Sequence, residues 1–525
     1  MLKNYNHNRA KILWVDDEIH ILKSHILFLE KKGYNVKGVY SAEHALEILE
    51  QEIFDILLLD ENMNGMDGLT ALKKIKTIYN NLPVIMITKN EEEWLMDEAI
   101  GYKADNFLTK PVNPSQILLA CKDILDSTKI LNDKVTEHYL SEFQSLNSNM
   151  QRITDINGWY ETYNILCDWI LNLDEMEDKN LSSIFNDQYQ VANKLFTDFI
   201  TYNYKDWLKK EIRPCFSNDI IKNHIKPFLD KQEKVVFIVL DCLSLDLWKK
   251  ISNLLYKYYR IENNYILSIL PTSTAFSRNA IFSGMFPDEL FKNYPNQNKN
   301  MWNDDKSRNR FEDFFLKNQI DKLGLHGKKI KYEKIVTLEQ GKKIVSNLNN
   351  YKEFDLCAIV VNFIDILGHS RSESDVLKEI ITDRSSYRAA VLNWFENAWL
   401  FEMLKEISYW GHKVVITSDH GIVQVKKPVL VKGDKNTSTG IRMKYGKNLN
   451  LSDKKALVIK KPTDYKLPNF DGLTNYIIAK DRNFFVYSNN SNSFISNFKD
   501  SFQHGGISLD EMILPLAVLD GKKNE

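Results

Sequence analysis

The sequence predicts a multidomain α/β protein in which two α/β domains flank a helical segment. Short apolar runs alternate with segments of helical period in residues 11–110, and apolar runs of strand length return after residue 234. Between them, residues 123–230 show amphipathic helical spacing. A chain of 525 residues is also too long for one hydrophobic core. We therefore predict domains at residues 1–125, 126–228 and 229–525.

Composition and cysteine usage indicate an ordinary folded protein with reduced thiols. Apolar residues make up 43% of the chain and charged residues 26%, and the formal net charge of -1 excludes a strong global attraction to nucleic acid or anionic membranes. The five cysteines are scattered without a Cys-x-x-Cys pair, which argues against a disulfide framework or a cysteine zinc site. No apolar run approaches the roughly 20 residues of a membrane span. We expect a cytoplasmic protein without membrane insertion.

Polar residues follow the predicted strands of the first domain. These strands are expected at residues 12–15, 55–59, 83–87 and 106–108. In parallel βαβ units their carboxyl ends meet at one sheet edge, which gathers Asp16, Asp17 and Asp60 there. Three crowded carboxylates require a hard divalent cation, usually Mg²⁺. Thr88 and Lys110 reach the same edge and could hold the oxygens of an acyl phosphate on Asp60.

These residues, together with the run at residues 104–111, resemble a response-regulator receiver domain, which has a flavodoxin-like parallel sheet. The resemblance implies that a cognate sensor histidine kinase phosphorylates Asp60. It also implies that Asp17, Asp60 and the Asn62 carbonyl hold Mg²⁺. One residue departs from the family pattern, because Asn64 stands where proline is usual.

The resemblance further implies how phosphorylation is sensed. Asp16 belongs to the acidic pair of the family motif, and Thr88 and Lys110 would contact the phosphoryl group. Phe107 would be the aromatic residue that repacks on activation. We hypothesise that this change exposes a face that forms a phosphorylation-dependent homodimer and reaches the C-terminal domain through the helical segment.

Aromatic residues at helical spacing dominate the middle segment, for example Trp159, Tyr163, Trp169 and Phe196. Such residues are far more often the core of a helical bundle than a stacking platform for bases. The segment shows no basic recognition helix of the kind that reads DNA. We therefore predict a helical-bundle connector that carries dimer contacts.

Acidic residues and histidines follow the apolar runs of the C-terminal domain. The runs at residues 235–240, 356–361, 414–417 and 484–487 are expected to be strands. The residues at or shortly after their ends are Asp241, Asp365, His369, Asp419, His420 and His504. Each alone has a plainer explanation, such as a turn pair or a loop histidine, but their common placement predicts a metal site.

The six ligands exceed the needs of one zinc ion and divide into two sets of three, which leaves each metal open to substrate. Zn²⁺ suits mixed carboxylate and imidazole ligation, and Mn²⁺ is an alternative. Two ions about 4 Å apart could clamp an in-line phosphoryl displacement. A hydroxyl at the expected helix start, from Thr272, Ser273 or Thr274, is the candidate nucleophile, although such a residue could serve only as an N-cap.

The order of these residues, closed by the run at residues 504–511, resembles the PglZ branch of the alkaline phosphatase superfamily. Together with the receiver motifs, it resembles the PorX-like response regulators associated with type IX secretion. The resemblance implies Thr272 as a zinc-activated nucleophile. It places one zinc ion on Asp241, Asp419, His420 and Thr272, and the other on Asp365, His369 and His504.

The sequence defines the substrate less closely. Residues 426–447 are rich in lysine and arginine, and Arg442 and Lys444 within them are possible substrate contacts, as is Arg278; a solvated loop and a structural ion pair are the alternatives. The PorX resemblance implies a phosphodiesterase that acts on cyclic and linear oligonucleotides. The alternatives are a signalling protein that binds a partner such as a sigma factor, with a structural metal domain, and a phosphomonoesterase or sulfatase.

Overall fold

A computed structural model describes residues 10–89, 98–125, 127–176, 179–297, 309–433, 438, 440–449, 451, 454–487 and 491–522. The chain forms two compact units, residues 1–140 and 141–525. From residue 141 onward the helical connector therefore packs with the C-terminal domain. The predicted α/β class is confirmed, whereas the boundaries of three separate domains stay a prediction.

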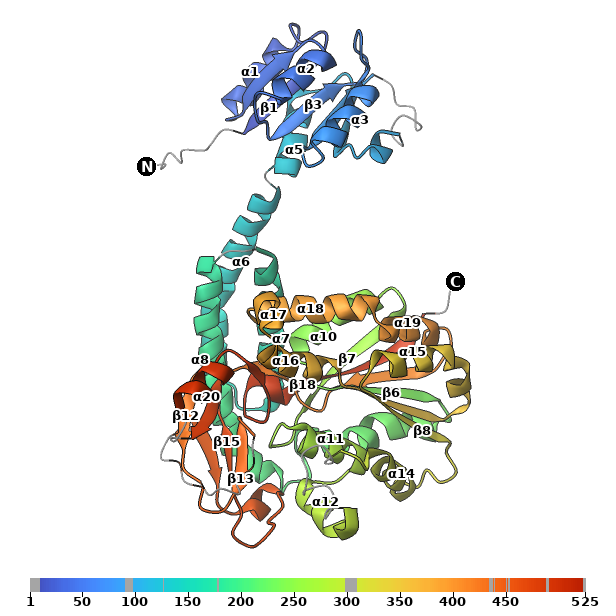
Figure 1. Cartoon of the computed structure of the whole chain (residues 1–525), viewed down its shortest axis with the longest axis vertical. Helices are drawn as coiled ribbons and strands as arrows, with labels where there is room; N and C mark the ends of the chain where they lie inside the picture. The colour runs from blue at the N-terminus through green and yellow to red at the C-terminus, as the bar shows by residue number, and fades with distance from the viewer. Residues whose placement is uncertain are drawn as a thin grey trace. The chain divides into compact units, whose positions relative to one another are not determined.

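The first unit is a five-stranded parallel sheet in the order β2-β1-β3-β4-β5, with helices packed against it (Figure 1). Its strands are β1 (Lys11–Val15), β2 (Asn35–Val39), β3 (Ile56–Asp60), β4 (Val84–Thr88) and β5 (Asn106–Thr109). Its helices include α1 (Lys23–Lys31), α2 (Ala42–Leu49), α3 (Gly68–Ile78) and α5 (Pro114–Leu125). The four predicted strands are confirmed. The sequence pattern misses β2, because Lys37 and Gly38 interrupt its apolar residues.

Three long helices form the middle of the chain: α6 (Ser127–Met150), α7 (Ile156–Met176) and α8 (Lys179–Trp207). Trp159, Tyr163, Trp169 and Phe196 are all buried, and Trp159 packs edge-on against Phe196 with ring centres 5.4 Å apart. The prediction that these aromatic residues form a bundle core is thus confirmed. Among the described residues, no helix is both long and apolar enough to cross a membrane.

The C-terminal domain is built on a six-stranded sheet in the order β7-β18-β10-β6-β9-β8. Its strands are β6 (Val235–Leu240), β7 (Tyr259–Leu267), β8 (Ile330–Ile335), β9 (Leu356–Val361), β10 (Lys413–Thr417) and β18 (Ile513–Gly521). β10, β6, β9 and β8 run parallel, and β18 is antiparallel to both its neighbours. The carboxyl ends of β6, β9 and β10 therefore meet at one edge, as predicted.

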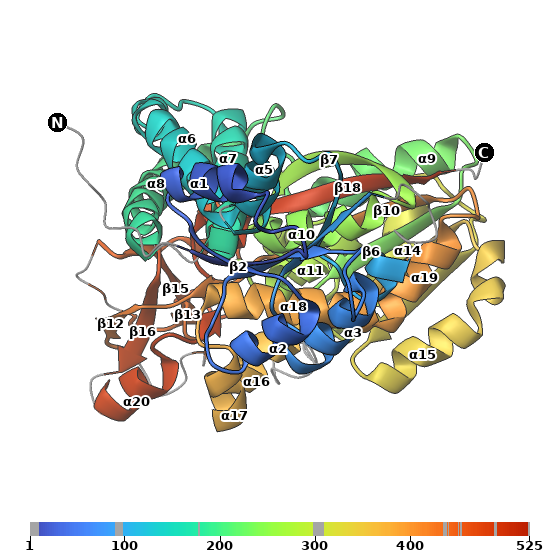
Figure 2. The same cartoon turned by 90° about the horizontal axis from the view of Figure 1, so that it is seen from above.

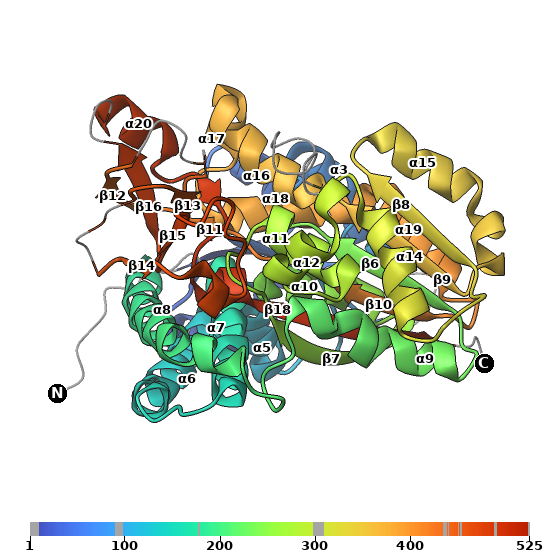
Figure 3. The same cartoon turned by 90° about the horizontal axis from the view of Figure 1, so that it is seen from below.

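Helices cover both faces of this sheet. On one face lie α11 (Thr274–Ser283), α12 (Pro287–Asn293) and α14 (Glu312–Lys322), which share a hydrophobic core with β6 and β9 (Figures 1 and 3). On the other face lie α10 (Leu245–Leu255) and α18 (Arg384–Asn397) (Figures 1 and 2). The remaining helices include α15 (Leu338–Ser346), α16 (Phe363–Glu373), α17 (Asp375–Ile380), α19 (Trp399–Ile407), α20 (Ser491–Phe498) and α21 (Leu509–Met512).

Small sheets lie beside the main one. They pair β12 (Lys427–Val431) with β16 (Asn483–Tyr487), β11 (Val423–Gln424) with β17 (Phe502–Gln503), and β15 (Asn475–Ala479) with both β13 (Met443–Gly446) and β14 (Ala456–Ile459). The apolar run at residues 484–487 is therefore a strand, as predicted, and it pairs with β12 outside the main sheet. An apolar run predicts that a strand is buried, but it does not predict which sheet the strand joins.

Candidate metal centres and phosphorylation site

The acidic residues of the first unit lie together at the carboxyl ends of β1 and β3. Asp16, Asp17 and Asp60 have carboxylate oxygens within 4.8 Å of one another. Lys110 Nζ lies 2.8 Å from Asp16 and 2.9 Å from Asp60. Burial raises the pKa of Asp60 to about 6, against the hydrogen bond from Lys110. This crowded carboxylate set, in which Asp16 and Asp60 are buried and Asp17 is half-buried, has the donor chemistry of a Mg²⁺ site.

The other residues predicted for this unit surround that set. Thr88 Oγ1 donates a hydrogen bond to Glu61 at 3.0 Å, and the half-buried Phe107 packs against the core beside β4. Asn62 is exposed. Asn64, which departs from the family pattern, donates to Asp17 Oδ2 at 3.2 Å. An asparagine here therefore orients a predicted magnesium ligand, a role that proline could not fill.

We expect the affinity of this site for Mg²⁺ to fall about tenfold between pH 7.5 and pH 5, because a proton competes for Asp60 once the pH drops below its pKa of about 6. In the metal-free protein the same raised pKa destabilises the fold as pH rises from about 4 to 6, and Mg²⁺ would offset this loss. Calorimetric titration of the full chain measures the affinity. The Asp60→Asn variant should lose the pH dependence, and equal affinities of the unaltered protein at both pH values would contradict the prediction.

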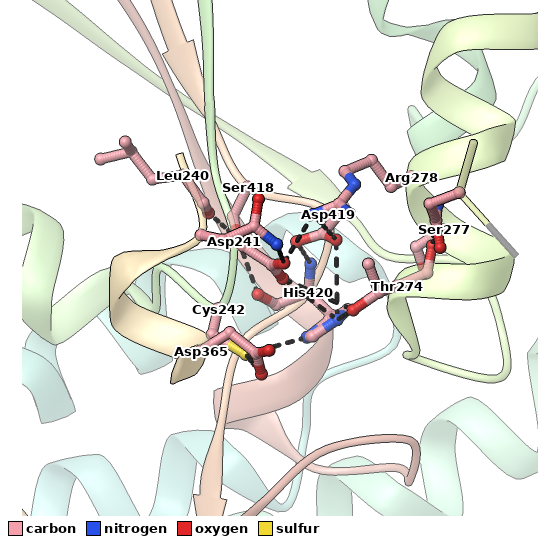
Figure 4. Close-up of polar contacts among 12 residues, drawn as sticks. Leu240, Asp241, Cys242, Thr274, Ser277, Arg278, Asp365, Ser418, Asp419 and His420 are labelled. Atoms are coloured by element: carbon pink, nitrogen blue, oxygen red, sulfur yellow. Dashed lines mark hydrogen bonds and ion pairs between the residues drawn. The ribbon is translucent and has the colours of Figure 1, made fainter. Parts of the chain in front are cut away.

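In the C-terminal domain, the first ligand set consists of Asp241, Asp419 and His420, which follow the adjacent parallel strands β6 and β10. His420 Nε2 lies 3.7 Å from Asp241 Oδ1 and 3.6 Å from Asp419 Oδ2 (Figure 4). All three side chains are fully buried, and Asp419 Oδ2 makes no hydrogen bond to any described residue. A bound cation would satisfy this carboxylate oxygen.

The second ligand set consists of Asp365, His369 and His504. Asp365 and His369 lie one turn apart on α16, and His504 follows β17. Asp365 Oδ1 lies 3.2 Å from His369 Nε2 and 3.6 Å from His504 Nε2, and the two imidazole nitrogens are 3.4 Å apart. Tetrahedral zinc with bonds of about 2.0–2.1 Å separates its ligand atoms by about 3.4 Å. The residues of both sets therefore fit zinc.

The electrostatics of the two sets also favour a cation. Burial and the neighbouring Asp419 raise the pKa of Asp241 to about 8, and burial raises the pKa of Asp419 to about 6. Burial opposes ionisation of Asp365 as well, but the hydrogen bond from His369 and the nearby imidazoles bring its pKa below the ordinary value. Burial lowers the pKa of His504, which favours the neutral imidazole that binds metals. Positive charge between the carboxylates would relieve their repulsion.

The hydroxyl beside the first ligand set is that of Thr274, the first residue of α11. Thr274 Oγ1 lies 2.8 Å from His420 Nε2 and 3.5 Å from Asp241 Oδ1 (Figure 4). Thr272 is fully buried, and its hydroxyl donates to the Gly506 carbonyl at 2.7 Å. The geometry therefore does not support Thr272 as nucleophile and zinc ligand, and the candidate becomes Thr274.

Arg278 joins the first ligand set to α14. Its Nη1 lies 2.5 Å from Asp241 Oδ2, and its Nε lies 2.6 Å from Glu312 Oε1. The guanidinium is almost fully buried and lies one helical turn after Thr274. The alternative of a structural ion pair is confirmed. The side chain also lines the cavity beside the ligands, and its contact with a substrate stays a prediction.

Arg442 and Lys444 do not line that cavity, which corrects their predicted role as substrate contacts. Arg442 is fully buried and pairs with Glu511, so its charge is used within the fold. Lys444 is 1% exposed, and its Nζ lies 4.4 Å from the centre of the Tyr487 ring. The basic run at residues 426–447 contains the strands β12 and β13 and is not one solvated loop; Asp434 and Lys435 lie outside the described residues.

Cys242 is a site residue that the sequence analysis did not identify. Its Sγ lies 3.2 Å from Asp365 Oδ1 and 3.5 Å from His420 Nδ1, so it contacts one ligand of each set. Its backbone has φ of 68°, a conformation that few residues other than glycine adopt. Its position directly after Asp241 is the sequence feature that could have identified it. Because the cysteines form no Cys-x-x-Cys pair, the sequence instead places Cys242 among the reduced thiols without a role in metal binding.

A cavity of about 810 Å³ adjoins both ligand sets. Its lining includes Thr274, Arg278 and Lys334, and Lys334 Nζ lies 3.4 Å from Glu312. A cavity of this size accepts a phosphate ester with an organic group attached. The arrangement can therefore hold two cations, a hydroxyl nucleophile and a phosphate ester together.

Three family models match the chain in succession. The response regulator receiver domain matches residues 12–122, and the PorX response regulator linker domain matches residues 129–208. The BREX system PglZ alkaline phosphatase-like domain matches residues 220–519, which is more than half of the chain. This succession is the receiver, linker and PglZ arrangement of PorX-like response regulators.

Curated relatives match shorter stretches. The regulatory protein VanRc of Enterococcus gallinarum is 28% identical over 134 residues, which are 26% of this chain and 58% of VanRc. The alkaline phosphatase synthesis transcriptional regulatory protein PhoP of Bacillus subtilis is 34% identical over 122 residues, which are 23% of this chain and 50% of PhoP. The chain thus spans little more than half the length of these relatives. A solved CheY-like receiver domain protein from Methanospirillum hungatei JF-1 is 32% identical with a TM-score of 0.22, and the match covers 23% of this chain and 96% of that one.

Proposed function

The chain belongs to the family of the PglZ alkaline phosphatase-like domain and has the PorX-like arrangement of receiver, linker and PglZ domains, and on this premise we propose that it is a response regulator whose output is a two-zinc phosphodiesterase. The observation that carries the proposal is the placement of Thr274 Oγ1 2.8 Å from His420, beside two ligand sets with the spacing of zinc sites. A degraded, purely structural metal domain would not need to keep a hydroxyl at that position.

The residues of the site suit phosphoryl transfer through a covalent intermediate. Two zinc ions, when bound, supply positive charge for the attacking and leaving oxygens. Thr274 Oγ1 gives up its proton and attacks phosphorus, the bond from phosphorus to the leaving oxygen breaks, and that oxygen leaves with a proton. Water then hydrolyses the phosphodiester on Thr274, which restores the hydroxyl and releases the phosphate with its remaining arm. The side chain of the N-cap residue Ser273 makes no capping hydrogen bond, which leaves amides at the start of α11 for phosphate oxygens. Arg278 holds Asp241 in place from the opposite side.

We propose a phosphodiester of the oligonucleotide class, cyclic or linear, as the substrate. The cavity is much larger than a phosphate group and continues past the ligands along Ser438, Gly440 and Met443, which leaves room for the second ester arm. One observation favours monoester hydrolysis as a second candidate. Lys334 lines the same cavity with its side chain 30% exposed, and a cation there could meet a third phosphate oxygen.

The test compares hydrolysis of bis-para-nitrophenyl phosphate, para-nitrophenyl phosphate and a short oligonucleotide by the zinc-loaded full chain. We expect the diester and the oligonucleotide to be cleaved faster than the monoester, and dialysis against a chelator to remove at least about 99% of the rate until zinc is restored. Faster cleavage of the monoester would favour the second candidate. Equal, slow hydrolysis of all three with and without zinc would exclude the enzyme and leave a signalling protein that acts by binding.

The proposed regulation follows the order of the domains. A cognate sensor histidine kinase phosphorylates Asp60 in the cytoplasm, and the phosphorylated receiver forms a homodimer that changes the state of the linker helices. Binding of a sigma factor and control of type IX secretion are further parts of this proposal. Its support is the PorX-type linker between the receiver and the PglZ domain.

A further inference from the structure

Helix α8 of the linker contacts two loops that carry site residues. We name them the nucleophile loop, residues 268–273, which leads into Thr274, and the histidine loop, residues 504–510, which begins at His504 and runs into the first residues of α21. Both loops are hydrogen-bonded to α8, which runs along one side of the domain (Figures 1 and 3). The two loops are also joined directly, because Thr272 Oγ1 donates to the Gly506 carbonyl.

At the nucleophile loop, α8 acts through Tyr204. Its hydroxyl oxygen accepts a hydrogen bond from the Leu270 backbone N–H at 2.8 Å. Tyr204 is 1% exposed, and its ring packs between Phe216 and Tyr465 with ring centres 5.5 and 6.3 Å away. This packing fixes the hydroxyl, and the hydrogen bond fixes a backbone position four residues before Thr274.

At the histidine loop, α8 acts through Asn193, which is fully buried. Its Oδ1 accepts a hydrogen bond from the Leu509 N–H at 2.8 Å, and its Nδ2 donates to Asp481. One turn earlier on the helix, the Tyr189 hydroxyl donates to Asp510 Oδ1 at 2.8 Å. The segment that follows His504 is therefore held by two consecutive turns of α8.

A single rigid helix thus sets the spacing between the two loops. Asn193 and Tyr204 are eleven residues apart on α8, which is about 16 Å along a helix with a rise of 1.5 Å per residue. Rotation or sliding of α8 would move both anchor points together. Thr274 lies beside the first ligand set, and His504 is a member of the second. A movement of α8 would therefore disturb both sets.

We propose that Tyr204 and Asn193 are positioning residues through which the linker helix α8 aligns Thr274 and His504. The inference rests on the proposed function, since it concerns the same site. It also assigns the linker a direct task, because any signal that displaces α8 reaches the nucleophile loop and the histidine loop at once.

The Tyr204→Phe variant tests the nucleophile loop. It removes one hydroxyl and keeps the packed ring, and Tyr202→Phe is the matched control, because Tyr202 lies on the same helix with its side chain 81% exposed. In the zinc-loaded full chain, Tyr204→Phe should lower kcat on bis-para-nitrophenyl phosphate about tenfold, with KM changed less than about twofold. Zinc content should match the control, and the melting temperature should fall by no more than the loss of one buried hydrogen bond explains. A kcat equal to that of Tyr202→Phe would overturn the role of Tyr204.

The Asn193→Asp variant tests the histidine loop without relying on turnover. It places a carboxylate against Asp481 and should lower the zinc retained after gel filtration in zinc-free buffer from about two ions per chain to about one. In the double variant that adds Asp481→Asn, the amide at position 481 can donate to the carboxylate at position 193, whose other oxygen can still accept from the Leu509 N–H. The double variant should therefore regain the second ion. Asn203→Ala is the control on the same helix, because the Asn203 amide bonds only the helix carbonyl of Phe199 among described contacts.

The outcomes separate this inference from the proposed function. If the unaltered protein binds two zinc ions but hydrolyses no ester, the proposed function fails, and zinc retention still decides the role of Asn193. If Asn193→Asp retains as much zinc as Asn203→Ala, or the double variant recovers none, the role of Asn193 is wrong.

Discussion

The Thr274→Ala variant is expected to lose about 10³-fold or more in kcat/KM on bis-para-nitrophenyl phosphate, because removal of a covalent nucleophile leaves only the binding and electrostatic contributions of the site. Its hydroxyl lies beside His420 and Asp241, and its burial is partial, so the truncation opens no large cavity in the core. Steady-state kinetics of the zinc-loaded full chain measures the loss. Zinc content should stay at about two ions per chain, since each set keeps its three protein ligands.

Thr272→Ala is the matched comparison, with the same chemical change two residues earlier. It removes the hydrogen bond to Gly506, which should cost about 1 kcal/mol of stability and about tenfold or less in kcat. Thr274→Ser keeps a hydroxyl and should keep much of the activity. The opposite result would be a loss of about 10³-fold in Thr272→Ala with normal turnover by Thr274→Ala. In that case the nucleophile is Thr272, and the assignment made from geometry is wrong.

Asp365→Asn is expected to release one of two zinc ions and lower kcat by at least about 10²-fold, because the second ligand set then has no carboxylate to balance the ion. Asp365 Oδ1 is the atom that faces both His369 and His504, so no other oxygen of the set replaces it. Elemental analysis after gel filtration gives the zinc content, and hydrolysis of the diester gives the rate.

Asp375→Asn is the control for this change, because Asp375 lies on the neighbouring helix α17 with its side chain 95% exposed and paired only with Lys378 among described residues. It should retain both zinc ions and the full rate. Loss of zinc from Asp365→Asn without loss of rate would mean that the second set is structural. Retention of both ions would show that Asp365 is not a ligand.

Much of the site could be predicted from sequence, because the order of strands and polar residues largely determines which side chains meet. Asp241 and Asp419 each follow a continuous apolar run, and parallel strands of that kind bring their carboxyl ends to one sheet edge. Asp365 and His369 are four residues apart, which a helix places on one face. The acidic residues after β1 and β3 follow the same rule in the first unit.

Other features depended on contacts between distant segments. Arg442 belongs to a basic run that suggested solvent or substrate, but Glu511, distant in sequence, neutralises it inside the fold. His504 reaches its set through β17, which pairs with β11, and not through the apolar run at residues 484–487. No local sequence pattern predicts these contacts. The residues that flank an arginine in sequence do not show whether its charge is buried in an ion pair or exposed to solvent.

The sequence by itself determined the two α/β domains, the helical segment between them, and the six Asp and His residues of the candidate metal sets, since these follow from periodicity and from residues placed at strand ends. Only the tertiary structure decided which hydroxyl faces the ligands, because Thr272 and Thr274 are the same residue type two positions apart. In the fold, Thr274 is the first residue of α11 and its hydroxyl contacts His420, whereas the Thr272 hydroxyl bonds the Gly506 carbonyl. It alone also joined α8 to both loops of the site, through hydrogen bonds between residues up to 316 positions apart. Contacts at such separations depend on the packing of whole elements, which short-range sequence patterns do not encode.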